Sequence, residues 1–340
     1  MRRMKPIMLK IGFVLFTYNH EKFISESLFS ALNQDYPSLD IIIKDDCSSD
    51  HTNEIINDIL TSYEGRHCLH YDQGKENRGK VARLNEVFSM NKFDLLILAD
   101  GDDISHTSRA SKIVGAWVSR GTPPMTLLHS GRTILADEER DIDGLEQLPR
   151  EGSRVTLEDY LSCPRALVFG STIACTTDLY NRFGPLEEST YIEDLQLTFR
   201  ALLLGQVVAV EDYLVDYRVH ANNISAELSL IDRIRWIKYI EKFQLVLLKN
   251  LSDLHKAGLE DVSFRLVDQH IRLKIESFEK SANFLKKGIL GALCFVIQYP
   301  GVQSGRFRLN FILRQLGFSN SFLYKMMFKL LRAARSISLR

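Results

Sequence analysis

Short apolar runs alternate with amphipathic segments through the first hundred residues. Four of these runs predict buried strands: Ile11–Phe16, Leu39–Ile43, Cys68–Tyr71 and Leu95–Ala99. Between them, apolar residues recur at helical spacing in Glu21–Leu32, in a segment carrying Ile55, Ile56, Ile59 and Leu60, and in one carrying Val81, Leu84, Val87 and Phe88. This order predicts an α/β fold, with a mostly parallel sheet and helices on both faces.

The pattern changes in the second half of the chain. Strands are expected at Met125–Leu135, Gly170–Cys175, Val207–Val210 and Tyr213–Arg218, and a helix at Glu193–Leu204. From about Leu228 onward nearly every segment has helical spacing. We therefore expect an α/β domain over residues 1–226, with halves at 1–105 and 106–226, followed by a helical region over 227–340.

Charge is balanced over the whole chain but not along it. The 340 residues carry 43 Lys and Arg against 43 Asp and Glu, and 45% are hydrophobic, which is typical of a folded globular protein. Residues 280–340 contain 11 Lys and Arg and no acidic residue. A segment of this kind favours contact with an anionic surface.

The five cysteines and the apolar segments limit the class of protein. The number of cysteines is odd and none of them has the spacing of a zinc site, which favours reduced thiols in a cytosolic protein. The run Ile11–Phe16 is too short for the core of a signal peptide. Gln298, Pro300 and Gln303 interrupt the uncharged stretch from Gly288 to Gly305, so no membrane-spanning segment is expected.

Three of the predicted strands end in polar residues. These ends are Thr17-Tyr18-Asn19, Asp45-Asp46 and Asp100-Gly101-Asp102-Asp103. Ligands of parallel α/β sheets bind at the carboxyl ends of the strands. No glycine-rich dinucleotide or P-loop motif is present, which argues against a dehydrogenase or a P-loop NTPase.

Several of these side chains suit a metal and a nucleotide. Asp100 and Asp102 flank a glycine at a tight turn, so both could face one Mg²⁺ or Mn²⁺, although such a run can equally be a solvated turn. Asp46 could accept a hydrogen bond from a base imide, and Tyr18 could stack on the base. The alternative for Asp45 and Asp46 is that they cap the helix that follows.

Three further segments carry candidate chemistry. Asn77-Arg78-Gly79-Lys80 precedes a helix and suits phosphate, although for Lys80 we favour a solvent-exposed loop. Glu193 and Asp194 open a helix, where a carboxylate stays ionised and can serve as a general base. Arg218 suits a diphosphate and His220 a metal. The other histidines, His20 and His70 among them, receive no role.

At this point the chain resembles the family-2 glycosyltransferases of the GT-A fold, from about Ile11 to Ser225. The resemblance rests on motifs in a fixed order: Thr17-Tyr18-Asn19, the helix from Ser27 to Pro37, Ile41 to Thr52 (similar to IIVxDDxSxDxT), Asn77-Arg78-Gly79 with Asn85, the DxD region at Asp100 to Asp103, Glu193-Asp194 with Arg200, and Tyr217-Arg218-Val219-His220.

The resemblance implies roles for these residues. Tyr18 and Asp46 would bind the base, usually uracil, and Asp100 the ribose or the metal. Asp102 would be the main ligand of Mn²⁺ or Mg²⁺. Because Asp103 follows directly, the register of the DxD motif is ambiguous by one residue; we favour Asp102 as the ligand and Asp103 as a cap of the next turn. Asp194 would deprotonate the acceptor hydroxyl. The remaining implied nucleotide-sugar contacts are Thr17, Asn19, Arg78, Asn85, Gly101, Glu193 and Arg218, with His220 near the metal or phosphate.

The expected protein is thus a metal-dependent, inverting hexosyl- or N-acetylhexosaminyltransferase. It would use a nucleotide sugar, most simply a UDP-sugar, and a glycan or lipid-linked acceptor in bacterial surface glycan synthesis. The alternative is a catalytically inactive binding or scaffold subunit of a glycan-assembly complex.

The basic tail leads us to expect a peripheral protein at the inner face of the membrane. Phe322–Leu339 has apolar and basic residues on different helical faces, and Gly288–Tyr299 could enter the same interface. The alternative is a helical subdomain that packs on the catalytic domain or forms a homo-oligomer. Nucleic acid is not an expected partner, because no aromatic-basic motif is present.

Overall fold

A computed structural model describes residues 9–136, 155–162, 168–190, 192–220, 233–258 and 262–286. The chain divides into two units, Met1–Ala221 with Leu245–Ile271, and Asn222–Gln244 with Arg272–Arg340. The two tail segments predicted from sequence to meet a membrane, Gly288–Tyr299 and Phe322–Leu339, lie outside the described residues. None of the described helices is both long and apolar enough to cross a bilayer.

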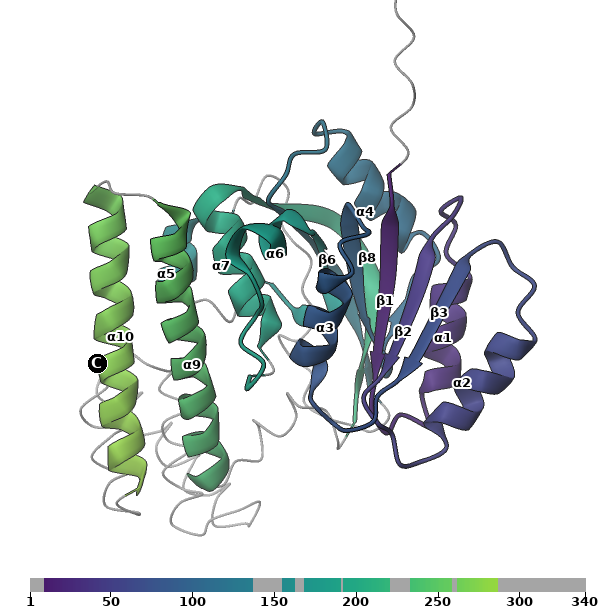
Figure 1. The fold of residues 1–340 in the computed structure, drawn as a ribbon, viewed down its shortest axis with the longest axis horizontal. Coiled ribbons are helices and arrows are strands. Elements are labelled where there is room, and N and C mark those ends of the chain that lie inside the picture. Colours follow the sequence, from purple (N-terminus) through teal and green to yellow (C-terminus); the bar gives the residue numbers. More distant parts are fainter. Residues whose placement is uncertain are drawn as a thin grey trace, which may run out of the picture. The chain divides into compact units, whose positions relative to one another are not determined.

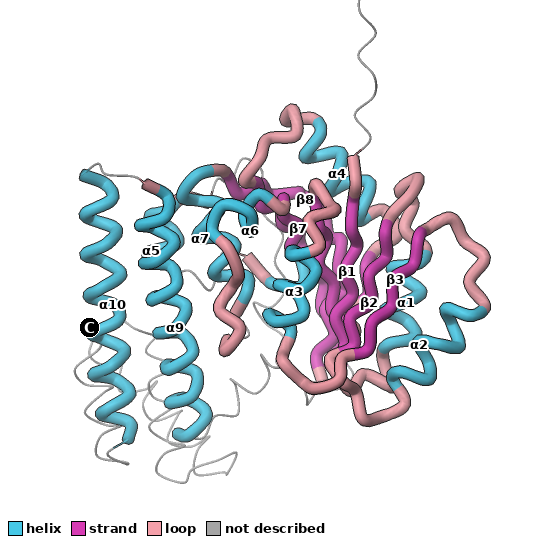
Figure 2. The backbone as a smooth tube through the Cα atoms, in the orientation of Figure 1, coloured by secondary structure: helices cyan, strands magenta, loops and turns pink. Residues whose placement is uncertain are grey.

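The first unit is built on one eight-stranded sheet (Figures 1 and 2). Its strands are β1 (Ile11–Thr17), β2 (Asp40–Asp45), β3 (Cys68–Gln73), β4 (Leu95–Asp100), β5 (Ile104–Ser105), β6 (Thr126–Ala136), β7 (Ile173–Thr176) and β8 (Gln206–Val219). The spatial order is β3-β2-β1-β4-β7-β6-β8-β5. Strands β3, β2, β1 and β4 run parallel, as do β6 and β8, whereas β7 is antiparallel to both its neighbours.

Helices connect and cover the strands. They are α1 (Ile24–Leu32), α2 (Thr52–Thr61), α3 (Lys80–Ser89), α4 (Arg109–Val118), α5 (Leu157–Ser162), α6 (Asp178–Phe183), α7 (Glu193–Leu204), α9 (Arg233–Ala257) and α10 (Val262–Lys286), with a 3-10 turn η2 (Gly170–Thr172). The mostly parallel sheet with flanking helices and the helical carboxyl-terminal region confirm the predicted fold class.

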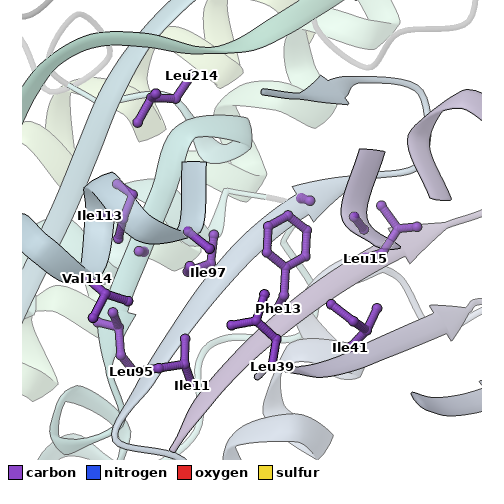
Figure 3. Close-up of a cluster of buried hydrophobic side chains, with 14 of the residues drawn as sticks. Ile11, Phe13, Leu15, Leu39, Ile41, Leu95, Ile97, Ile113, Val114 and Leu214 are labelled. Atoms are coloured by element: carbon purple, nitrogen blue, oxygen red, sulfur yellow. The ribbon is translucent and has the colours of Figure 1, made fainter. Parts of the chain in front are cut away.

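The core follows from the apolar runs of the central strands. Phe13 and Ile97 point to the same face of the sheet and are completely buried, and Figure 3 shows them beside Ile113 and Val114 of α4. Helices α1 and α2 contribute Leu28 and Ile56 to the same cluster. In Figure 1, α3 lies on the opposite face of these strands from α1 and α2. Because both faces are covered, the strands are apolar throughout and polar residues occur at their ends.

Two elements differ from their predictions. The segment Gly170–Cys175, predicted to be a strand, begins with the 3-10 turn η2 at Gly170–Thr172, and β7 starts only at Ile173. The segments Val207–Val210 and Tyr213–Arg218 belong to a single long strand, β8, rather than to two. Its pairing with β6 shifts twice around Gly131, so that β8 carries extra residues at this point. A bulge interrupts the alternation of apolar and polar residues, which is why the sequence pattern looked like two strands.

Candidate active site

The polar strand ends meet at one edge of the sheet, as the sequence predicted. Thr17 at the end of β1 pairs with Asp45 of β2, and Phe16 pairs with Asp100 at the end of β4. The carboxyl end of β8 reaches the same place, because the backbone N–H of Arg218 donates to Asp103 Oδ1 at 3.0 Å. Both halves of the α/β unit therefore contribute to one site.

The turn after β1 is fastened to the loop after β2. Asn19 adopts a φ of 55°, a left-handed conformation that asparagine tolerates. Its Oδ1 accepts the backbone N–H of Ser49 at 2.8 Å, and its own N–H donates to Ser48 Oγ at 2.8 Å. The neighbouring Tyr18 is 42% exposed. Its ring is thus an accessible apolar surface beside the site.

Asp46 joins the loop before α3 to the sheet. Its buried carboxylate accepts the backbone N–H groups of Arg78, at 3.0 Å, and Gly79, at 2.6 Å. Arg83 donates from Nε to the same carboxylate at 2.8 Å. Gly79 has a φ of 87°, which glycine adopts at low cost. Asp45 does not cap α2 either: it accepts from Ser48, and Asp50 receives the N–H of Thr52.

Asp102 lies between two histidines. Its Oδ2 is 3.0 Å from Nε2 of His220 and 3.8 Å from Nε2 of His20. Burial opposes ionisation of Asp102, but the hydrogen bond from His220 and the charge of His20 outweigh it and lower its pKa. A side chain at Gly101 would place Cβ 2.7 Å from Thr17 Oγ1 and 2.8 Å from His20 Nδ1, so this close approach requires glycine.

Asp103 points into the protein and is held by β8. The expectation that it caps the next turn is wrong, because Oδ1 accepts the backbone N–H of Arg218. Its Oδ2 is buried and has no hydrogen-bond partner. Burial raises the pKa of Asp103 well above its usual value, and the nearby charges of Asp102 and Asp100 raise it further.

This donor set fits a divalent cation. Carboxylate oxygens are the usual ligands of Mg²⁺ and Mn²⁺, and imidazole is accepted by Mn²⁺. Asp102 and His220 present an oxygen and a nitrogen 3.0 Å apart, and His20 lies beside them. The Oδ2 of Asp103 is buried without a hydrogen-bond partner, and the neighbouring negative charge of Asp100 and Asp102 disfavours ionisation of Asp103. A cation here would offset that charge.

Lys80 lies inside the site, which corrects the prediction of a solvent-exposed loop residue. Its Nζ is 2.6 Å from Asp100 Oδ1 and 2.7 Å from Glu193 Oε1, and the side chain is 19% exposed. Burial alone would lower the pKa of Lys80, but the two carboxylates outweigh it and hold the pKa above its usual value. Lys80 therefore links the DxD turn to the start of α7.

Arg132 of β6 is buried between two aromatic rings, within the electrostatic influence of Asp103 and Asp194. Its guanidinium stacks 3.7 Å from the ring centre of Phe169 and 4.3 Å from that of Tyr217. Burial lowers the pKa of Arg132, while Tyr217, Asp103 and Asp194 act in the opposite direction. Asp103 and Asp194 thus both lie within the electrostatic reach of one buried arginine. The side chain of Asp194 is part-exposed.

Two predicted site residues, Asn85 and Arg78, have partners within the protein. Both N–H groups of the Asn85 amide are used, because Nδ2 donates to Leu186 O and to Glu188 Oε1, at 3.0 and 3.1 Å. Asn85 positions the segment before α7. Arg78 forms ion pairs with Glu86 and Glu188, at 3.1 and 2.9 Å, at the part-exposed rim.

Sequence reasoning missed Lys80, His20 and Arg132. His20 directly follows the Thr17-Tyr18-Asn19 turn, and Lys80 directly follows the left-handed Gly79, so their neighbours in sequence were a usable signal. For Arg132 no local signal exists, since its stacking partners come from residues 169 and 217.

The motifs of the first half match a family model. Residues 13–122 match the model described as Glycosyl transferase family 2. This part of the chain is therefore similar to the family-2 glycosyltransferases. The match contains both the strand-end turns and the DxD region, so the resemblance drawn from the motifs is confirmed.

Relatives of the family-2 domain extend the similarity over most of the chain. An uncharacterized glycosyltransferase of Rickettsia typhi is 21% identical over 85% of this chain and 89% of its own length. A putative teichuronic acid biosynthesis glycosyltransferase, TuaG of Bacillus subtilis, is 22% identical over 73% of this chain and 93% of its own length.

Solved structures share the GT-A fold. Residues 1–349 of S. aureus TarS, in complex with UDP-GlcNAc, superpose with a TM-score of 0.58 at 18% identity, covering 90% of this chain and 84% of that one. The mannosyltransferase PcManGT of Pyrobaculum calidifontis, in complex with GDP-Man and Mn²⁺, gives 0.52 at 14% identity, covering 94% and 83%. One protein binds a UDP-sugar and the other a GDP-sugar, so the fold does not determine the base.

Proposed function

We propose that this protein is an inverting, metal-dependent glycosyltransferase that moves a sugar from a nucleotide sugar to a hydroxyl group. The observation that carries the proposal is the convergence of the DxD turn, His220 and Lys80 at the strand ends, with Asp194 next to Glu193, the second ion-pair partner of Lys80, in the first turn of α7. The donor would occupy the half formed by residues 1–105 and the acceptor the half formed by 106–226.

The donor end of the site supplies surfaces of the right kind. The exposed ring of Tyr18 would stack on the base, and Asp46 would receive the base imide at its remaining lone pairs. Thr17, Asn19 and Gly101 would line the ribose and the phosphates, and Asp100 would bind the ribose or the metal. Asp102 and His220 would hold Mn²⁺ or Mg²⁺, which when bound neutralises charge on the departing diphosphate.

The chain's own residues would carry out the transfer. Asp194 would take the proton of the acceptor hydroxyl as its oxygen bonds to the anomeric carbon on the face opposite the diphosphate. The bond from the anomeric carbon to the phosphate oxygen breaks in the same step, which inverts the configuration. Lys80 and the side chains of Arg218 and Arg78 would stabilise the leaving group, and Glu193 would position Lys80.

The biological setting is proposed from the relatives. TuaG is described as acting in teichuronic acid biosynthesis, and two further relatives are described as poly-β-1,6-N-acetyl-D-glucosamine synthases. We infer that the acceptor is a glycan or a lipid-linked glycan of a bacterial surface polysaccharide, and that UDP is the nucleotide. The glycosyl transfer would take place at the inner face of the membrane.

Thermal unfolding with nucleotides tests the donor site first. UDP, GDP, dTDP and CMP are each added with and without Mn²⁺, and we expect UDP to raise the melting temperature in a Mn²⁺-dependent way. A shift with GDP in place of UDP would correct the base. No shift with any nucleotide would favour the scaffold alternative.

Replacement of Asp194 tests the chemistry separately. Asp194→Asn should retain the donor-induced thermal shift and lose transfer by about 10²–10⁴-fold, the usual contribution of a general base. Its matched control is Asp178→Asn, since Asp178 also lies in the first turn of a helix. If Asp194→Asn lost donor binding, its assignment as the base would be wrong.

A further inference from the structure

A second group of metal-ligating side chains lies at the opposite end of the parallel strands from the DxD turn. Asp40 begins β2, and Cys68 and His70 occupy the first and third positions of β3. One ligand atom from each residue lies within 4.8 Å of the other two. Since β2 rises by about 3.3 Å per residue, this group is roughly 16 Å from the strand end at Asp45.

The sheet geometry brings these three side chains together. Cys68 and His70 are two residues apart on one strand, so their side chains project from the same face. Asp40 pairs directly with Cys68 in the parallel register and therefore points to that face as well. A sheet can thus place three ligands together when two alternate residues of one strand face a residue of the adjacent strand. Sequence spacing did not reveal it, because Asp40 comes from another strand.

The distances suit a tetrahedral ion bound by sulfur and nitrogen. Cys68 Sγ lies 3.6 Å from His70 Nε2, and His70 Nε2 lies 2.6 Å from Asp40 Oδ1. Zinc bonds of about 2.3 Å to sulfur and about 2.0 Å to nitrogen, at the tetrahedral angle, place sulfur and nitrogen about 3.5 Å apart. The carboxylate would move outward by about 0.7 Å from its hydrogen bond to reach the corresponding position.

We propose that Asp40, Cys68 and His70 form a second metal site, for Zn²⁺ or a cation of similar softness, at the amino-terminal ends of β2 and β3. Thiolate and imidazole select such ions, whereas the carboxylates of the DxD turn suit Mg²⁺ and Mn²⁺. Binding requires the thiolate and a neutral imidazole, so the thiol proton is released to solvent. Three protein ligands leave the fourth position to water.

The site would act on the edge of the sheet. In the described sheet β3 is the terminal strand and pairs with β2 alone. An ion bound to Asp40 on one strand and to Cys68 and His70 on the other would cross-link the two and stabilise the native state by mass action. This inference does not depend on the glycosyltransferase proposal, because it concerns neither the donor nor the acceptor.

Cobalt is the probe for the test, because it substitutes for zinc and absorbs light. A full-length variant with Cys47→Ser, Cys163→Ser and Cys294→Ser keeps Cys68 and the buried Cys175. Titrated with Co²⁺ in excess Mg²⁺, it should gain a thiolate-to-cobalt charge-transfer band and the visible bands of tetrahedral cobalt, and Zn²⁺ should remove both.

Matched variants assign the ligands. Adding Cys68→Ser should abolish the charge-transfer band, and His70→Ala or Asp40→Asn should weaken Co²⁺ binding by at least about tenfold. The control is His51→Ala, because His51 is an exposed histidine paired with a carboxylate, Glu54. Far-ultraviolet circular dichroism establishes that each variant is folded. A band that is absent before Cys68 is replaced, or that persists afterwards, would overturn the proposal.

Discussion

At the residue scale, Lys80 says most about how the site is assembled, because its ammonium group lies between two carboxylates. Asp100 belongs to the DxD turn and Glu193 to the first turn of α7, and Lys80 pairs with both. Their proximity depends on segments far apart in sequence, so a local pattern could not reveal it. The strand-end carboxylates were predictable because parallel topology alone brings them to one edge.

Replacing Lys80 with methionine keeps the side chain's length and removes its charge. Lys80→Met should tighten Mn²⁺ binding by about tenfold, or about 1.4 kcal/mol, because the ammonium no longer competes for Asp100. This change in binding free energy is smaller than the interaction energy of two unit charges 4 Å apart near a protein surface, which is about 4 kcal/mol. The loss of a cation beside the diphosphate should lower kcat/KM.

Calorimetric titration with Mn²⁺ and a transfer assay measure the two effects. Lys80→Arg, which keeps the charge, is the control and should leave Mn²⁺ affinity close to that of the unmodified protein. Equal Mn²⁺ affinity in Lys80→Met and the unmodified protein would mean that Lys80 and the cation do not share a carboxylate.

At the element scale, local patterns predicted the strands and helices that form the continuous first half. They also predicted α7 with its bounds, because its apolar residues recur at helical spacing. Helices α4, α5 and α6 and the short strand β5 were not predicted. Helices α5 and α6 and strand β5 carry too few residues for periodicity to show, and β5 exists through pairing with the distant β8. Helix α4 has ten residues and buries Ala110, Ile113, Val114 and Trp117 at helical spacing, so its pattern was present in the sequence but was not recognised.

Helix α7 is fastened by a buried ion pair to the part of α9 in the same unit. Arg200 donates from Nε to Asp253 at 2.7 Å, and both side chains are completely buried. Arg200 also donates to the carbonyl groups of Gly184 and Pro185. The arginine therefore joins three segments around the helix that carries Asp194.

Removing one partner of this pair should be costly. Arg200→Met leaves the buried carboxylate of Asp253 with only Lys249, whose Nζ lies 4.0 Å away, to offset its charge. We expect the unfolding free energy to fall by about 3–5 kcal/mol in urea denaturation. The double variant Arg200→Met with Asp253→Leu should recover part of that loss, since no charge is left buried. If the two single losses simply added in the double variant, the residues would not act as a pair.

At the scale of the whole molecule, buried histidines link stability to pH. His129 in β6 is 6% exposed, and its Nε2 has no hydrogen-bond partner. Burial lowers the pKa of His129 to about 4 from an ordinary value of 6.5. As the pH falls below 6.5, His129 is protonated in the unfolded chain but stays neutral in the folded chain. The free energy of unfolding that is present above pH 6.5 is therefore lost progressively towards pH 4.

This linkage predicts a measurable acid destabilisation. Between pH 7 and pH 5, His129 should cost the native state about 2 kcal/mol of unfolding free energy. His129→Gln should remove that part of the pH dependence, whatever it does to stability at pH 7. The measurement is urea denaturation at both pH values, and an unchanged difference between them would contradict the assignment.

The basic tail gives a second prediction at this scale. Residues 318–340 carry Lys325, Lys329, Arg332, Arg335 and Arg340 and no acidic residue. Each basic residue near an anionic membrane contributes about 1 kcal/mol. Truncation at residue 317 should therefore release the protein from anionic vesicles in a sedimentation assay, with neutral vesicles as the control. Unchanged sedimentation would favour the helical subdomain alternative.

The irregular pairing of β6 with β8 determines the position of Arg218 and His220, at the end of β8, relative to the DxD turn. Ser130 pairs with Val210, Gly131 with Tyr213 and Arg132 with Val215, so β8 gains length relative to its neighbour before it reaches Arg218. A deletion there would withdraw Arg218 and His220 from the DxD turn without altering any residue that touches a ligand. The number of extra residues in this bulge therefore sets the position of Arg218 and His220 relative to the DxD turn, and related proteins could be grouped by the length of the bulge.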